Sequence, residues 1–185
     1  MSFRAQYEHG KVAESAIARW LMSRGNAVMP VYEILDQQYK GPQLFTLKGG
    51  IIAPDMLAFC GTEMLWVEAK HKTGFTWWRK GGVFETGIDL HHFAEYQRVA
   101  SVTGRPVWVL FLHKGGQAKD SPPSPSGLFG NEVKVLAANE SHRDPRWGKH
   151  GMVYWTRQQP DGGALRFLAA YSDVLAADVP REHGG

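Results

Sequence analysis

Cysteine is almost absent from this chain of 185 residues, in which Cys60 stands alone. A single cysteine excludes a disulfide within the chain and is typical of proteins kept in a reducing compartment. Long apolar runs are missing too, because no stretch approaches the roughly 18 to 20 residues that a membrane-spanning helix needs. The amino-terminal segment MSFRAQYEHGKVAE lacks the apolar centre of a signal peptide. We therefore expect a cytoplasmic protein without a membrane partner.

A strong excess of one charge is also missing. The 21 lysines and arginines face 18 aspartates and glutamates, which gives a formal net charge of +3 at pH 7. This balance is compatible with a nucleic-acid partner and does not demand one. Hydrophobic residues make up 43% of the chain, which is ordinary for a soluble domain with a real core. Because no internal repeat or convincing boundary is evident, we expect a single domain over residues 1–185.

A helix is predicted over about residues 7–24, where apolar side chains recur at helical spacing. The apolar face contains Ala13, Ala16, Ile17, Trp20 and Leu21. Gly25 follows where a helix commonly ends. Glu14 lies about 20° from Leu21 around the helix axis, so it either reaches along the edge of a sheet or stays in solvent. Short strands are predicted next, over 27–32 and 44–47.

The most informative pattern is Pro54-Asp55, followed after twelve residues by Glu68-Ala69-Lys70. Two apolar runs joined by Gly61-Thr62 separate these motifs, which predicts a β-hairpin. Because side chains alternate along a strand, Glu68 and Lys70 share one face while Ala69 points to the other. The alternative is that Asp55 only begins a strand and that Glu68 and Lys70 form an exposed pair of little energetic weight.

This hairpin favours a metal-assisted reaction at a phosphate. Mg²⁺ takes oxygen ligands and usually keeps several waters, so Asp55, Glu68, the Ala69 carbonyl and Glu14 are the candidate ligands for one or two ions. Mn²⁺ can substitute. Such an ion polarises a phosphate and activates its bound water. Lys70 is expected to orient that water and to stabilise negative charge in the transition state.

A second helix is predicted over about 89–103, with Asp89 as N-cap and Gly104 after its end. Its inward face is expected to contain Leu90, Phe93, Ala94 and Ala100. Gln97 falls in the middle of that face, where an amide needs a partner. It either bonds a backbone carbonyl or faces the site and supports a ligand. The run 107–112 is apolar throughout, as a buried central strand should be.

Between these elements lies a basic and aromatic segment, residues 71–80. Its cationic groups would neutralise phosphates, while Phe75 or the tryptophans would stack on exposed bases. The candidate nucleic-acid contacts are His71, Lys72, Trp77, Trp78, Arg79 and Lys80. Adjacent tryptophans are alternatively core or dimer-interface anchors. His91-His92 lacks partners at zinc spacing and is expected on an exposed helix surface.

The last third of the chain carries weaker patterns. Residues 115–131 are rich in Gly, Ser and Pro and are predicted as a loop. Strands are predicted over 133–138, 152–157 and 165–169, with a turn at 160–163 between the last two. The tail from 179 onward is expected to be frayed.

The order of these elements resembles the core of the PD-(D/E)xK nuclease superfamily, an αβββαβ arrangement with a mixed central sheet flanked by helices. Within it, the chain looks most like the archaeal-type Holliday junction resolvases. Their first helix begins with a glycine and has a glutamate four residues later, here Gly10 and Glu14. The resemblance covers about residues 7–113 and implies functional roles for Glu14, Asp55, Glu68 and Lys70. Some branches also place a glutamine on the second helix, as Gln97 is here.

The resemblance implies an α/β restriction-endonuclease-like fold with a β-rich extension over about 114–178 and a tail over 179–185. It implies a Mg²⁺-dependent DNA endonuclease of prokaryotic or viral origin that acts on branched DNA in recombination and repair, as a homodimer. A longer connection over 31–50 and the extension depart from the compact resolvases. A restriction-like or repair nuclease, or a non-catalytic nucleic-acid-binding module, therefore stays open as an alternative.

Overall fold

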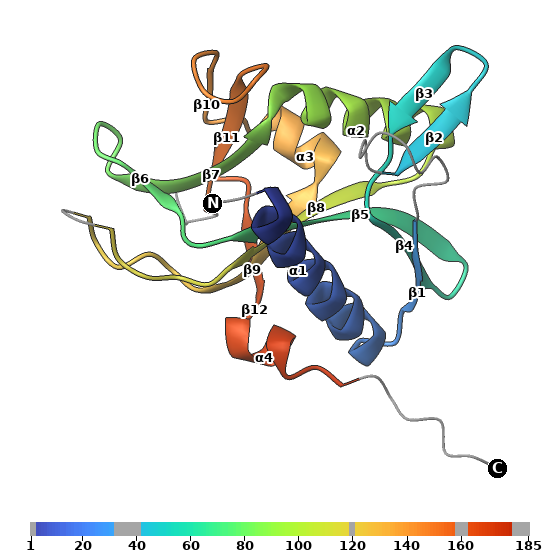
Figure 1. Cartoon of the computed structure of the whole chain (residues 1–185), viewed down its shortest axis with the longest axis horizontal. Helices are drawn as coiled ribbons and strands as arrows, with labels where there is room; N and C mark the ends of the chain where they lie inside the picture. The colour runs from blue at the N-terminus through green and yellow to red at the C-terminus, as the bar shows by residue number, and fades with distance from the viewer. Residues whose placement is uncertain (1–2, 32–41, 119–120, 158–162, 179–185) are drawn as a thin grey trace.

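The computed structural model describes residues 3–31, 42–118, 121–157 and 163–178. The helices are α1 (Phe3–Ser23), α2 (Leu90–Thr103), α3 (Val133–Ala138) and α4 (Tyr171–Leu175) (Figure 1). The strands are β1 (Ala27–Pro30), β2 (Gln43–Thr46), β3 (Gly49–Ile52), β4 (Met56–Cys60), β5 (Glu63–Lys72), β6 (Thr76–Trp78), β7 (Val83–Asp89), β8 (Val107–His113), β9 (Gly127–Glu132), β10 (His142–Asp144), β11 (Met152–Thr156) and β12 (Arg166–Ala169).

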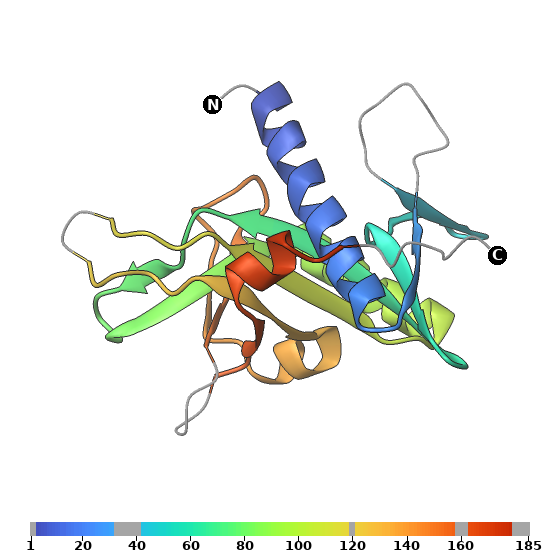
Figure 2. The ribbon, with the colours of Figure 1, turned by 90° about the horizontal axis from the view of Figure 1, so that it is seen from below.

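A six-stranded mixed sheet forms the centre of the molecule, in the order β1-β4-β5-β8-β9-β12. Strands β5 and β8 run parallel, and the other neighbours run antiparallel. Helices α1 and α4 cover one face of this sheet, and α2 and α3 cover the other (Figure 2). The predicted αβββαβ core with a mixed sheet flanked by helices is confirmed.

Two separate cores follow from the alternation of side chains in the sheet. Val67 and Ala69 of β5 point toward α1, where Ala13 and Ile17 are buried. Trp66, on the opposite face of β5, packs in the cluster that contains the buried residues of α2. At about 25 cal/mol per Å² of apolar surface removed from water, these two layers are the main source of stability. The same alternation sends Glu68 and Lys70 to the α2 side.

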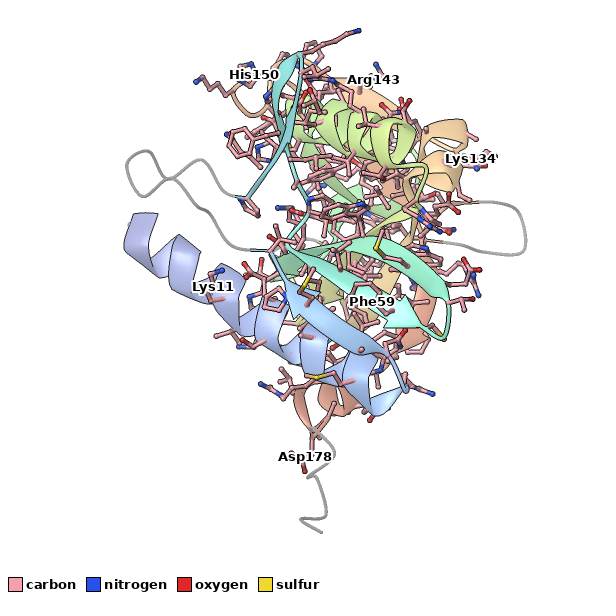
Figure 3. All side chains as sticks on the ribbon, turned by 90° about the vertical axis from the view of Figure 1, so that its right-hand side faces the viewer. Lys11, Phe59, Lys134, Arg143, His150 and Asp178 are labelled. Atoms are coloured by element: carbon pink, nitrogen blue, oxygen red, sulfur yellow. The ribbon has the colours of Figure 1, made fainter. Side chains whose placement is uncertain are left out.

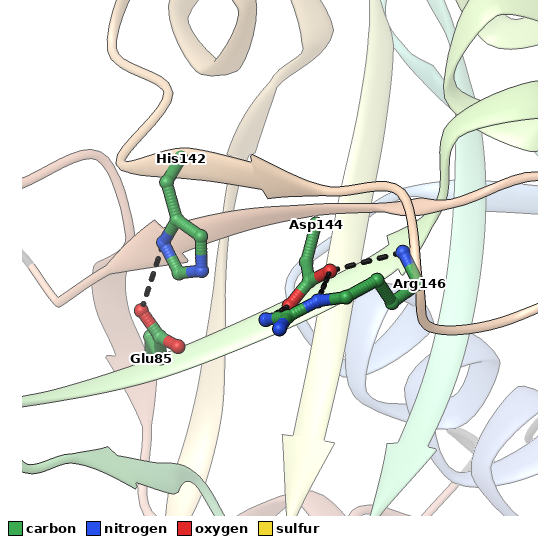
Figure 4. Close-up of polar contacts among 4 residues, drawn as sticks. All are labelled: Glu85, His142, Asp144 and Arg146. Atoms are coloured by element: carbon green, nitrogen blue, oxygen red, sulfur yellow. Dashed lines mark hydrogen bonds and ion pairs between the residues drawn. The ribbon is translucent and has the colours of Figure 1, made fainter.

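A second sheet, in the order β10-β11-β7-β6, packs beside the first. Its inner residues, among them Ile88 and Trp155, join the core beneath α2. At its other surface the buried carboxylate of Glu85 lies 3.4 Å from His142 Nδ1 (Figure 4). The His142 ring is stacked against Trp78 and Tyr154, with centroids 5.3 and 4.8 Å away. Strands β6 and β7 pair as an antiparallel hairpin, which is called the arm below. In chain order, the arm lies between β5 and α2.

Several predicted boundaries are confirmed, and each has a local cause. Helix α1 ends before Gly25, whose φ of 85° few other residues adopt readily. Gly61, with φ of 60°, turns β4 into β5. Asp89 caps α2 by accepting a hydrogen bond from the His91 N–H at 2.8 Å, and Gly104 ends the helix in the left-handed region. Strand β8 is buried between β5 and β9.

Other predictions were wrong. Residues 133–138 were predicted as a strand but form the helix α3. The prediction failed because an apolar run of this length is too short for its periodicity to distinguish a helix from a strand. Residues 127–131 belong to β9 rather than to a loop. Gly127 and Gly130 favoured a loop in the sequence, but both are needed in β9. A Cβ at Gly130 would collide with the Val109 carbonyl, and a Cβ at Gly127 would collide with the Ala169 carbonyl. Strands β11 and β12 lie in different sheets instead of forming a hairpin.

Some elements of the structure lie in segments for which the sequence predicted no helix or strand. Strands β3, β6, β7 and β10 and helix α4 were not predicted. The segment 114–178, which was predicted as an extension outside the shared core, contributes β9 and β12 to the central sheet itself. The residues 31–50 connection is described from 42 onward, where β2 and β3 form a hairpin, and the turn at 160–163 lies almost wholly outside the described residues. No helix in the described part has the length and apolar character that crossing a membrane requires.

Candidate active site

The β4–β5 hairpin brings Asp55, Glu68 and Lys70 together in the middle of the central sheet. Met56 pairs with Val67, so Asp55 enters β4 level with Glu68. The Ala69 N–H donates a hydrogen bond of 2.8 Å to Asp55 Oδ2, which fixes the aspartate against β5. Glu68 is only 2% exposed and forms an ion pair with Lys70 on its own strand. The predicted grouping of two carboxylates and one lysine is thus present.

The charges of this group are strongly coupled. Burial and then the neighbouring charge of Glu68 hold the pKa of Asp55 well above its usual value, although Lys70 and the Ala69 hydrogen bond oppose the shift. Burial lowers the pKa of Lys70, but the charges of Glu68 and Asp55 outweigh burial and raise that pKa overall. Lys70 therefore stays protonated and positively charged. Its charge compensates only part of the repulsion between the carboxylates, because the pKa of Asp55 is still raised.

This arrangement fits a hard divalent cation. No group of three His, Cys, Asp or Glu side chains in the described residues is placed to hold a metal. Mg²⁺ does not need one, because it is commonly held by one or two carboxylates with water in its other positions. Burial and then the charge of Glu68 raise the pKa of Asp55, and a bound cation would oppose that shift by favouring the ionised carboxylate. Asp55 and Glu68, with the Ala69 carbonyl, are the donors that suit such an ion.

Glu14 lies on α1, which covers the other face of the sheet, and it acts on the group through its charge. Its side chain is 24% exposed, and its Oε2 lies 2.7 Å from Lys11 Nζ. Figure 3 labels Lys11 on α1. After burial and the nearer charges, Glu14 adds to the raised pKa of Asp55 and of Lys70. The predicted position at the edge of the apolar face is confirmed, while a role for Glu14 as metal ligand stays a prediction.

Gln97 is not on the inward face of α2, and that prediction was wrong. Gln97 and Ala94 are exposed, whereas Phe93, Tyr96 and Val99 are buried. The apolar stripe of α2 is rotated by about one residue, or 100°, from the stripe that Ala94 and Ala100 indicated. Alanines give a weak signal for the buried face because they are tolerated on either side of a helix.

Tyr96 takes the place that Gln97 was expected to hold. It is 2% exposed, and its hydroxyl is hydrogen bonded to Glu68. Burial, followed by the charge of Glu68, raises the pKa of Tyr96 well above its usual value, so the hydroxyl remains a donor. One turn earlier, burial and then the charge of Lys70 lower the pKa of His92, which keeps this half-buried imidazole neutral near pH 7. The i, i+4 spacing of these polar rings was the available sequence signal.

Comparisons with known proteins add a likeness in fold. No family model matches the chain, and no curated protein matches it in sequence. The structure resembles that of Hjc, a Holliday junction resolvase from the hyperthermophilic archaeon Archaeoglobus fulgidus, with a TM-score of 0.48 and 12% sequence identity. The match covers 78% of this chain and 86% of that one. Because the likeness is this distant, the case for function rests on the residues of the site.

The basic segment divides into two parts. Lys72 lies on the same face of β5 as Lys70, and its Nζ donates a hydrogen bond of 2.9 Å to the Gly87 carbonyl on β7. Burial and then the charge of Lys70 lower the pKa of Lys72 to about 8. His71 is half-buried next to it on the opposite face. Arg79 and Lys80 are exposed at the tip of the arm between β6 and β7.

The aromatic residues of the segment have different surroundings. Phe75 is 7% exposed and stacked on His113 with centroids 3.8 Å apart, so it belongs to the core and is unavailable to a base. Trp78 stacks on His142 within the protein. Trp77 is half-buried and packs against Phe84 at 4.8 Å. Nucleic-acid contact by the segment stays a prediction, with Phe75 removed from the stacking candidates.

Proposed function

We propose that this chain is a metal-dependent endodeoxyribonuclease that hydrolyses phosphodiester bonds with Asp55, Glu68 and Lys70. The observation that carries the proposal is a buried carboxylate, Glu68, facing a half-buried and mutually repelling one, Asp55, beside a lysine that remains charged. Such a group costs folding free energy unless a ligand rewards it. A merely structural origin for all three charges is therefore disfavoured, and so is a non-catalytic module that only retains the fold.

Each residue has a definite task in this proposal. Asp55 and Glu68 would hold Mg²⁺ or Mn²⁺, with the Ala69 carbonyl and Glu14 as further ligands. When bound, the ion polarises the phosphate, lowers the pKa of a ligated water and offsets charge on the leaving oxygen. Lys70 would orient the attacking water and stabilise the negative charge that develops on the phosphate. Tyr96 would fix the orientation of Glu68 through its hydroxyl.

The substrate that we propose is branched DNA, cut by a symmetric homodimer. The Glu14 helix, Asp55 and Glu68-Ala69-Lys70 occur in the order that resembles the junction resolvases, which supports a branched substrate. A two-fold dimer suits an enzyme that must make paired cuts in two strands. The second sheet, β10-β11-β7-β6, is a specific observation in favour of a restriction-like or repair nuclease, because it adds surface beyond the shared core.

The test compares a four-way junction with a linear duplex of the same sequence, in Mg²⁺ and in Mn²⁺, with the cut sites mapped on every strand. We expect cleavage by the wild type that Asp55→Asn and Lys70→Ala each abolish, while both variants still bind DNA. Symmetric cuts on the junction would support the resolvase-like form, and equal cutting of both substrates would favour the alternative nuclease. A wild type that binds DNA but cuts nothing in either metal would refute the enzyme.

A further inference from the structure

A pocket lies directly beyond the carboxyl ends of the two parallel strands. Strands β5 and β8 end side by side, with Lys72 paired to His113. One wall of the pocket is the chain that leaves β5, and the other is the chain that leaves β8, which lie together at the same end of the molecule in Figures 1 and 2. The volume is about 600 Å³, within the range of roughly 300–1,000 Å³ for small-molecule sites. Crevices at this position of an open α/β sheet are common binding sites.

The pocket is built by contacts between its walls rather than left as a gap. Ser124 Oγ accepts a hydrogen bond of 2.8 Å from the Phe75 N–H, which joins the two walls. The Ser124 N–H donates to the Gly116 carbonyl at 2.6 Å, within the second wall. Gly115 and Gly116 have φ of 86° and 129°, a conformation that only glycine adopts freely. This turn lets the second wall close toward the first.

The lining has a distinctive chemistry. Its described residues combine one indole and one guanidinium with small hydroxyl and amide groups, and none of these described residues carries a carboxylate. The polar and aromatic side chains that can meet a ligand include Thr73, Thr76, Trp77, Arg79 and Gln117. Arg79 is exposed and has no hydrogen bond or ion pair with the residues that the structure describes, so its charge is available. An aromatic plane, one free cation and neutral donors suit a planar base with an attached phosphate.

We infer that this pocket takes one unpaired nucleotide of the DNA next to the cut, with its base on Trp77 and its phosphate at Arg79. The inference rests on the proposed function and deepens it. Thr73 follows Lys70 by three positions, so the pocket begins about 10 Å along the strand direction from the candidate active site. A base can enter only if it is unstacked and unpaired, which costs a few kcal/mol in an intact duplex. The substrate is therefore DNA with an unpaired nucleotide near the branch, in preference to a fully paired one.

Binding is measured in EDTA, so that nothing is cut, with two DNAs of matched sequence. One carries a single unpaired 2-aminopurine beside the branch point, and the other is fully paired. The wild type should prefer the unpaired DNA and should change the 2-aminopurine fluorescence when it binds. Trp77→Ala should reduce that preference about tenfold, a typical loss for one base-stacking contact, and Arg79→Ala should reduce it as well.

Two further variants keep the result unambiguous. Ala118→Phe adds a bulky side chain to the second wall and leaves residue 77 unchanged, so it should abolish the preference even if Trp77→Ala destabilises the arm. Trp147→Ala, which removes a tryptophan that is 64% exposed outside the pocket, should leave the preference unchanged. Equal affinity of the wild type for both DNAs, or a preference that survives Trp77→Ala and Ala118→Phe, would overturn the inference. If Asp55-dependent cleavage persists in that case, the proposed function stands; if no DNA is bound or cut, both fail.

Discussion

Substitution of Tyr96 by phenylalanine isolates one hydroxyl from the rest of the candidate site. The Tyr96 ring is buried in the core beneath α2, and Phe keeps that ring. Only the hydrogen bond to Glu68 is lost. Because the hydroxyl holds Glu68 in one orientation, the main effect should be on metal binding rather than on folding.

The expected size follows from the type of bond. A hydrogen bond to a charged group contributes about 1.5–3 kcal/mol, and loss of an outer-shell partner of a metal ligand typically lowers metal affinity about 10- to 100-fold. Glu68 is 2% exposed, so water cannot readily replace the tyrosine. We therefore expect the Mg²⁺ concentration for half-maximal cleavage to rise about tenfold or more in Tyr96→Phe, with partial recovery at saturating Mg²⁺.

The assay is a Mg²⁺ titration of cleavage, paired with a Mg²⁺ titration of the melting temperature. Tyr171→Phe is the matched control, since Tyr171 is a half-buried tyrosine on the α1 side of the sheet. This control should behave like the wild type in both titrations. An unchanged Mg²⁺ requirement in Tyr96→Phe would refute the view that this hydroxyl positions a metal ligand.

Three other predictions concern stability. Burial and Glu68 raise the pKa of Asp55, so the folded state binds its proton more tightly than the unfolded chain and stability falls as the pH rises through the carboxyl range; Asp55→Asn should melt higher than the wild type at pH 7 without divalent ions and should lose stabilisation by Mg²⁺. A lower melting temperature would contradict this. Burial lowers the pKa of Lys72 from 10.5 to about 8. Between these pH values the unfolded chain binds more protons, so the free energy of unfolding of the wild type should rise with pH relative to that of Lys72→Met. The same pH dependence of the free energy of unfolding in both proteins, measured by urea denaturation, would contradict this. Gly130→Ala should destabilise by about 1–3 kcal/mol in urea denaturation, because its Cβ meets the Val109 backbone, whereas Gly50→Ala meets only the Gln43 side chain and should cost less.

The parts of the site that sequence predicted are those fixed by short-range rules. The alternation of side chains in a strand placed Glu68 and Lys70 on one face, and a turn at Gly61 set the pairing of β4 with β5. The helix termini at Gly25 and Gly104 followed from the conformational freedom of glycine. These features depend on a few neighbouring residues, so one sequence contains the necessary information.

The features that sequence missed depend on distant contacts. The rotation of α2 that buries Tyr96 instead of Gln97 is decided by packing against the sheet, and alanines gave no reliable sign of it. Gly130 contributed to the prediction of a loop, yet it lies in β9. A glycine stands at this position of the strand because Val109 on the neighbouring strand leaves no room for a Cβ. The pocket needs segments that are separated in the chain by β7, α2 and β8. No local pattern encodes such a meeting.

The β4–β5 hairpin also has a consequence for how the molecule folds. Asp55 and Ala69 are joined by a hydrogen bond across only 14 positions, whereas the walls of the pocket meet across 49 positions between Phe75 and Ser124. Closing the shorter loop costs less chain entropy, so local contacts tend to form earlier than distant ones. The acidic pair should therefore assemble while α2 and β8 are still undocked. The repulsion between the two carboxylates would then raise the free energy of the folding transition state. Divalent ions should therefore accelerate refolding as well as stabilise the native state.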